Sequence, residues 1–270
     1  MPETNRIFQT SNFLSRIVSS VLMTCLFSAC VSTGGGRGSN SNVLQGADKA
    51  MIHAQLAKGY LQQKQYSVAK DELEKALRIN PNHSDSNYVM ALLMMQLEQY
   101  PLAESHFAKA VKSEPDNSAA AHDFGMLLCQ INKERESVEY FEIAVSNPLF
   151  ERSELSYMRA GECLARIGDP GAEQYLKKAL KVNPRLRPAL YRLAVIKHDA
   201  AAYFPARAYI ERYFAITKPQ PAALLLAYKI ESKLNATEMA SRYRSDLLEG
   251  FPGSAQARQL RKQTRNLNKN

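Results

Sequence analysis

The stretch MIHAQLAKGYLQQKQYSVAKDELEKALRINPN, residues 51–82, decides the fold of this chain. Its apolar residues recur at helical spacing in two runs that a short polar break separates, and Pro81 ends the second run. Residues 85–116 repeat the pattern without a gap, so that Pro115 stands 34 residues after Pro81. A helical hairpin that recurs at a fixed period predicts an array of stacked helix pairs.

The residues at equivalent positions of the two copies alternate in size. In the first copy they are Leu56, Ala57, Tyr60, Tyr66, Ala69, Leu73, Ala76 and Pro81, and in the second they are Met90, Ala91, Met94, Tyr100, Ala103, Phe107, Ala110 and Pro115. This set resembles the tetratricopeptide repeat (TPR), in which large and small apolar side chains let two antiparallel helices pack closely. The resemblance implies an all-α TPR superhelix, which is an α-solenoid.

Four further copies follow with increasing divergence. The proline of the third copy, Pro148, comes one residue early, the fourth copy needs a one-residue deletion, and the weak sixth copy ends at residues 251–253. We expect about six repeats over residues 47–253. A polar, basic segment over residues 254–270 should cap the array, because the end units of a solenoid need a polar outer face.

The N-terminus resembles a lipoprotein signal. Arg6 and Arg16 precede an apolar run, Ile17 to Ala29, that is shorter than a membrane span and typical of a signal-peptide core. The run ends in Leu-Phe-Ser-Ala-Cys, residues 26–30, which resembles a bacterial lipobox with Phe27 in place of the usual leucine. The resemblance implies that residues 1–29 are removed and that Cys30 is lipidated. An ordinary signal peptide or anchor, with Cys30 incidental, is the alternative.

The residues after Cys30 bear on which membrane of the cell the chain is expected to reach. Val31 stands where an aspartate would retain a Gram-negative lipoprotein at the inner membrane, so the resemblance implies an anchor on the periplasmic face of the outer membrane. Residues 30–46 then form the lipidated end and a flexible tether, because residues 33–42 are rich in Gly, Ser and Asn. No Gly-Lys-Ser/Thr follows this glycine run, so it is not a phosphate-binding loop.

Net charge restricts the partners. The formal charge of +9 falls to +8 when residues 1–29, with two arginines and one glutamate, are removed. Nucleic acid is not an expected partner at the outer membrane. A positive surface there suits anionic lipid, cell-wall polymer or an acidic partner segment, and a merely solvated lysine-rich face is the alternative.

No pattern of catalysis or metal binding is recognisable. The chain has no Gly-x-Ser-x-Gly, His-Glu-x-x-His or dinucleotide-binding motif, which predicts no catalytic residue, no cofactor and no small-molecule substrate. The five histidines lack the spacing of a zinc site, and we expect most of them at the surface or in turns. Cys129 and Cys163 fall on neighbouring first helices; an oxidising compartment permits a bridge, but packing as small apolar side chains is favoured.

The expected binding surface is the groove that TPR proteins form from the first helix of each hairpin. Residues one turn away from the packing set should line it, and these are Lys58, Leu61, Gln62, Tyr88, Leu92, Met95, Gln96, His122, Met126 and Gln130. Its apolar, methionine-rich centre can mould around a partner polypeptide. Alternatively Leu92 and Met95 belong partly to the core, and the exposed stripe shrinks to Tyr88 and Met126.

Several segments narrow the resemblance beyond the repeat. They are Ala-Gln-Leu-Ala-Lys-Gly-Tyr-Leu at 54–61, Phe-Glu-Arg-Ser at 150–153, Tyr-Phe-Pro-Ala-Arg at 203–207, Ala-Leu-Leu-Leu at 223–226 and Phe-Pro-Gly-Ser at 251–254. With the lipobox, they resemble the PilF/PilW family of type IV pilus biogenesis lipoproteins. The resemblance implies a pilotin, an outer-membrane adaptor that binds the secretin subunit and promotes its multimerisation. An adaptor that docks peptidoglycan hydrolases is the rival interpretation, and a metal- or nucleotide-dependent enzyme is a third.

Overall fold

A computed structural model describes residues 38–267. The chain divides into two units, residues 1–39 and 40–270, and the second contains nearly all the described residues. The expected signal peptide, Cys30 and the first part of the expected tether lie outside the described residues, so the structure does not bear on them.

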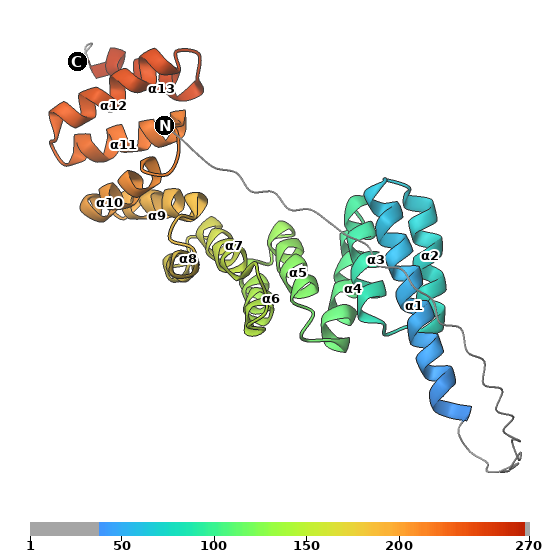
Figure 1. Cartoon of the computed structure of the whole chain (residues 1–270). Coiled ribbons are helices and arrows are strands. Elements are labelled where there is room, and N and C mark those ends of the chain that lie inside the picture. The colour runs from blue at the N-terminus through green and yellow to red at the C-terminus, as the bar shows by residue number, and fades with distance from the viewer. Residues whose placement is uncertain (1–37, 268–270) are drawn as a thin grey trace, which may run out of the picture. The chain divides into compact units, whose positions relative to one another are not determined.

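The described residues 38–267 are all-α, and their helices follow one another as successive hairpins (Figure 1). Six hairpins pair a first helix with a second helix: α1 (Gly38–Gln62) with α2 (Tyr66–Ile79), α3 (Ser84–Gln96) with α4 (Tyr100–Ser113), α5 (Ser118–Gln130) with α6 (Glu134–Ser146), α7 (Ser153–Arg166) with α8 (Gly171–Val182), α9 (Arg187–Asp199) with α10 (Tyr203–Phe214), and α11 (Pro221–Lys233) with α12 (Thr237–Gly250). A last helix, α13 (Ala255–Leu267), follows. The predicted helical-repeat solenoid is confirmed.

Each hairpin turns in the same way. The second residue after each first helix has a left-handed backbone, and these residues are Lys64, Glu98, Asn132, Gly168, Ala201 and Asn235. The next residue donates its N–H back to the carbonyl five residues earlier, as from Gln65 to Tyr60 at 2.9 Å and from Lys133 to Leu128 at 2.8 Å. This is the Schellman end of a helix, and it ends each first helix with its last carbonyls satisfied.

First helices form one side of the array. Beyond the contacts between consecutive helices, α5 contacts α7, α7 contacts α9, α9 contacts α11, and α11 contacts α13. The core consists of clusters that follow one another between the helices, and in the first of them Phe107 of α4 stacks on Phe124 of α5 with ring centroids 5.5 Å apart. The neighbouring first helices therefore present one shared face, which we call the first-helix face.

Two glycines allow the closest packing within hairpins. A β-carbon at Gly125 of α5 would lie 2.9 Å from the Phe141 ring of α6, and one at Gly161 of α7 would lie 2.7 Å from Leu176 Cγ of α8. A side chain at either position would displace the facing second helix. The glycine at this place in the third and fourth repeats thus fits the large residue opposite it.

The boundaries at both ends are informative. Helix α1 begins at Gly38, so residues 38–46 of the segment expected to form a tether lie within its N-terminal part. Residues 43–50 include Leu, Gln, Ala and Lys, which are good helix formers, and they extend the first repeat helix backwards. At the other end, α13 buries Ala257 and Leu260 against α11 and α12, as a capping helix should. Within residues 38–267, no helix has the length and apolar character needed to cross a membrane.

Candidate functional site

A cavity of about 360 Å³ lies on the first-helix face of α3, α5 and α7. Leu92 and Met95 of α3, Met126 of α5 and Leu155 of α7 supply its apolar walls, and we call it the apolar section. Leu92, Met95 and Met126 were each predicted to line a groove, and the structure brings them together. Leu92 and Met95 also pack partly against the core, so both descriptions of these residues hold.

His122 also lines the apolar section, although its side chain is buried. The expectation that most histidines lie at the surface or in turns is wrong for His122, which is 6% exposed. Its Nδ1 lies 2.7 Å from the hydroxyl of Ser156 on α7, and its ring meets Phe141 edge-on. Burial lowers the pKa of His122, and Arg152 and Arg159 act in the same direction against the opposing Asp123. The neutral imidazole of His122 therefore connects α5 to α7 through its hydrogen bond with Ser156.

Tyr88, another predicted groove residue, packs against the core and does not line the cavity, but it holds a residue that does. Its hydroxyl donates a 2.7 Å hydrogen bond to Asp123, which itself lines the cavity. Burial first and the Asp123 carboxylate second raise the pKa of Tyr88 far above its ordinary value. Tyr88 consequently stays protonated and holds Asp123 in place.

The remaining predicted groove residues do not line the apolar section. Gln130 lines the neighbouring cavity described next and donates to the Tyr100 hydroxyl at 3.1 Å. Leu61 packs against the core, whereas Lys58, Gln62 and Gln96 are exposed and line neither cavity. The structure thus concentrates the expected groove in the second and third repeats and continues it into the fourth.

A second cavity, of about 460 Å³, continues from the first because Met126 and Arg159 line both. Arginines of α7 and α9 dominate its wall, and we call it the basic section. Its lining residues are Met126, Cys129, Gln130, Arg159, Glu162, Cys163, Arg166 and Arg192. The two sections together are called the groove below.

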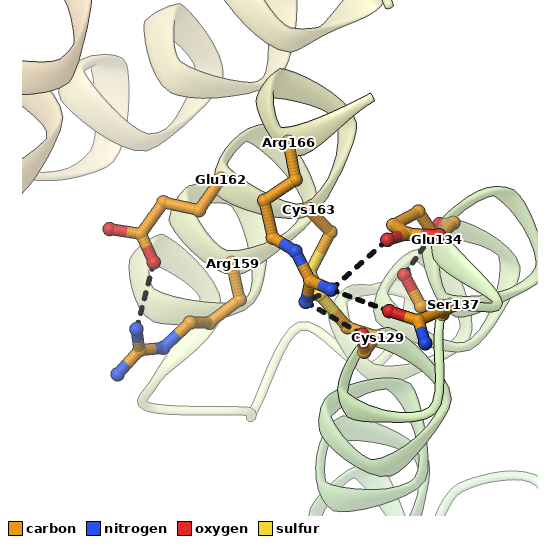
Figure 2. Close-up of a disulfide and its surroundings, with 8 residues drawn as sticks. Cys129, Glu134, Ser137, Arg159, Glu162, Cys163 and Arg166 are labelled. Carbon is orange, nitrogen blue, oxygen red and sulfur yellow. Dashed lines mark hydrogen bonds and ion pairs between the residues drawn. A yellow bond between two sulfur atoms is a disulfide. The ribbon is translucent and has the colours of Figure 1, made fainter. Parts of the chain in front are cut away.

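A disulfide forms the floor of the basic section, and the preference for two free, packed cysteines is wrong. Cys129 of α5 and Cys163 of α7 are bonded, with their Cα atoms 5.9 Å apart (Figure 2). They are 34 residues apart, which is one repeat, so stacking places them at facing points of adjacent first helices. The periodicity contained this information, but a bridge was kept only as the less favoured alternative to packing.

Arg166 secures the same junction. Its guanidinium donates to the Cys129 carbonyl at 2.7 Å and to Asn132 at 3.0 Å, and it pairs with Glu134 at 3.2 Å. Figure 2 shows Arg166 reaching from α7 towards Cys129 and Glu134, while Arg159 pairs with Glu162 on the other side of the drawn cluster. The third and fourth repeats are therefore fastened by a covalent bond and a bridging cation.

The arginines of the groove were missed by reasoning from the sequence. Arg152, Arg159 and Arg166 follow one another at intervals of seven residues, which is two helical turns, and therefore share one side of α7 and its N-terminal cap. That regularity was a usable signal. It was overlooked because the groove residues were chosen by apolar character.

The arrangement suits the binding of a polypeptide. Flexible thioethers and leucine side chains adjoin fixed cations on one side of a helical array, and this combination offers both adaptable and directional contacts. Among the described residues there is no group of three or more His, Cys, Asp or Glu side chains placed to hold a metal ion.

Comparison with known proteins agrees with this architecture. A sequence model of the tetratricopeptide repeat matches residues 60–136. The type IV pilus assembly protein PilF of Pseudomonas aeruginosa is 23% identical over 238 residues, which cover 86% of this chain and 92% of PilF. The crystal structure of PilW, a widely conserved type IV pilus biogenesis factor, superposes with a TM-score of 0.62 at 29% identity and covers 78% of this chain and 97% of PilW. A structure of Pseudomonas aeruginosa PilF superposes with a TM-score of 0.66 at 22% identity and covers 81% and 99% of the two chains.

The chain is a tetratricopeptide-repeat protein, and such repeats are scaffolds for protein interaction. Within that class it is homologous to PilF and matches PilW and PilF in structure, both of which are TPR proteins of type IV pilus biogenesis. The family relationship expected from the sequence is confirmed.

Proposed function

We propose that this protein is a lipid-anchored adaptor of the outer membrane that binds the type IV pilus secretin subunit and promotes its assembly into the multimeric pore. The observation that carries the proposal is similarity to PilF along almost the whole of both chains. A match of that extent reaches well beyond residues 60–136, which the generic repeat model covers.

The groove supports the binding part of the proposal. It gathers Leu92, Met95 and Met126 from two helices into one adaptable surface, which suits an apolar segment of another polypeptide. Charged groups adjoin this surface, so the same groove can select among apolar segments.

The Cys30 sequence motivates the anchoring part. Several acyl chains on one cysteine would hold the protein at a bilayer, whereas a single chain is marginal. A groove tethered there would raise the local concentration of its bound segment where the ring assembles. Binding and anchoring would therefore act together, and each can be tested alone.

The test of binding is a double substitution in the apolar section. A strain lacking the gene is complemented with the wild type or with the Leu92→Glu, Met126→Glu variant, and heat-resistant secretin multimers are quantified. We expect the variant to be present at normal level and the multimers to be lost, because two buried carboxylates would oppose an apolar partner. Leu102→Glu, on α4 and away from the groove, is the matched control and should keep the multimers.

The outcomes separate the parts of the proposal. Multimers that persist in the double variant reject the groove, and multimers that persist in the deletion strain reject the function. Normal multimers with a misshapen cell wall would favour the adaptor of peptidoglycan hydrolases instead. Cys30→Ala should move the protein out of the outer membrane, and an unchanged membrane fraction would reject the anchor.

A further inference from the structure

We propose that the basic section of the groove binds acidic side chains of the partner polypeptide while apolar residues next to them in its sequence occupy the apolar section. The inference rests on the proposed function, and it adds the chemistry of the segment that the groove holds.

The two sections form one continuous surface. Met126 of α5 and Arg159 of α7 line both of them, so the two sections adjoin at these side chains. A ligand that covers Leu92 and Leu155 therefore continues directly onto the arginines of α7 and α9. An extended segment is the simplest occupant of such a surface.

The charge of the groove is positive. Four arginines line it, Arg152, Arg159, Arg166 and Arg192, against the two carboxylates of Asp123 and Glu162. Both carboxylates are already engaged, Asp123 by the Tyr88 hydroxyl and Glu162 by Arg159. The surplus favours an anionic ligand.

The arginines of the groove differ in how many of their N–H groups already have a partner within the protein. Arg166 is held by Cys129, Asn132 and Glu134, so it shapes the floor. Arg192 of α9 is half-buried, and in the part of the chain that the structure describes it has neither a hydrogen bond nor an ion pair. A partly desolvated guanidinium without an acceptor is unfavourable, and a carboxylate can accept two of its N–H groups at once. Arg192 is therefore the main contact, and Arg159 can turn one of its N–H groups to the same ligand.

The apolar section favours a polypeptide over an anionic lipid surface as the source of the acid. A headgroup would use the arginines and leave Leu92, Met95 and Leu155 uncovered. A segment that carries leucine-like and acidic residues side by side covers both sections at once. Exposed lysines elsewhere would serve a lipid surface equally well, whereas the junction of apolar and basic sections is particular to the groove.

The experiment selects ligands without assuming the secretin. Random peptides displayed on phage are selected on the full chain in detergent, and the recovered peptides are measured by fluorescence anisotropy. We expect them to place Asp or Glu next to large apolar residues. Arg192→Glu should weaken their binding about tenfold or more, because a charge-assisted contact is replaced by a repulsion. Replacing their acids by amides should have a similar effect, and added salt should weaken the wild-type complex.

Lys181→Glu is the matched control, since it makes the same charge reversal at an exposed residue of α8 outside the groove, and it should bind as the wild type does. Selected peptides without acids, no selected peptides at all, equal binding by Arg192→Glu, or displacement by phosphatidylglycerol added in mixed detergent micelles would each overturn the inference. If the wild-type protein selects acidic peptides but the deletion strain still forms secretin multimers, only the proposed function is rejected. If secretin multimers require Leu92 but the selected peptides bind the Arg192→Glu variant as tightly as the wild type, only the inference is rejected.

Discussion

Reduction of the Cys129–Cys163 disulfide should destabilise the middle of the array more than its ends. The bond closes a loop of 34 residues that contains all of α6. Closing a loop of that length in the unfolded chain stabilises the folded state by about 4 kcal/mol in the chain-entropy treatment. We therefore expect the free energy of opening of α5, α6 and α7 to fall by about 4 kcal/mol when the bond is reduced.

Amide hydrogen exchange measures this region by region, which matters because a repeat array need not unfold in one step. Oxidised and reduced full chains are compared at the same pH, and amides of α11 and α12 serve as the internal reference. The Cys129→Ala, Cys163→Ala double variant should exchange alike with and without reductant. Equal protection of α6 in the oxidised and reduced chains, or two free thiols in protein isolated from an oxidising compartment, would refute the reasoning.

Three other predictions concern single positions. Ala201 has a left-handed backbone, which is less favourable for alanine than for glycine. In urea unfolding, Ala201→Gly should therefore raise the stability by about 0.5 kcal/mol, and Gly168→Ala at the equivalent turn should lower it by a similar amount. Glu231 is 2% exposed and paired with Arg207, so Arg207→Met should cost about 3 kcal/mol by leaving a buried charge, and adding Glu231→Leu should restore most of the loss. Because burial lowers the pKa of His122 below its ordinary 6.5, the unfolded chain binds the proton more readily, so stability should fall as the pH drops below about 6.5, and His122→Gln should flatten that dependence in thermal melts at successive pH values.

Much of the fold could be predicted from the sequence because the repeat signal is redundant. The alternation of large and small apolar residues recurs at nearly the same spacing in successive copies, so loss of one position leaves the pattern recognisable. The start of α1 could not be placed, because glycine and serine before Val43 indicate flexibility when considered alone.

The apolar part of the groove and the alignment of Arg152, Arg159 and Arg166 were predictable from the sequence, whereas the contribution of Arg192 was not. Leu92 and Met126 stand one turn from the packing set, and helical geometry alone turns them towards the same face. Arg192 joins the groove only through the stacking of α9 on α7, which depends on the angle between repeats and cannot be derived from periodicity. The disulfide differs in this respect, since the separation of 34 residues between Cys129 and Cys163 already places them at equivalent points of two neighbouring first helices.

The central claim is that the groove holds a segment of the secretin subunit. It is tested most directly by placing a photo-activatable amino acid at Met126 in living cells, with the same residue at exposed Ala108 of α4 as the reference. We predict that illumination cross-links the secretin from position 126 and not from position 108. Absence of secretin from the position 126 products, or equal capture from both positions, would contradict the account.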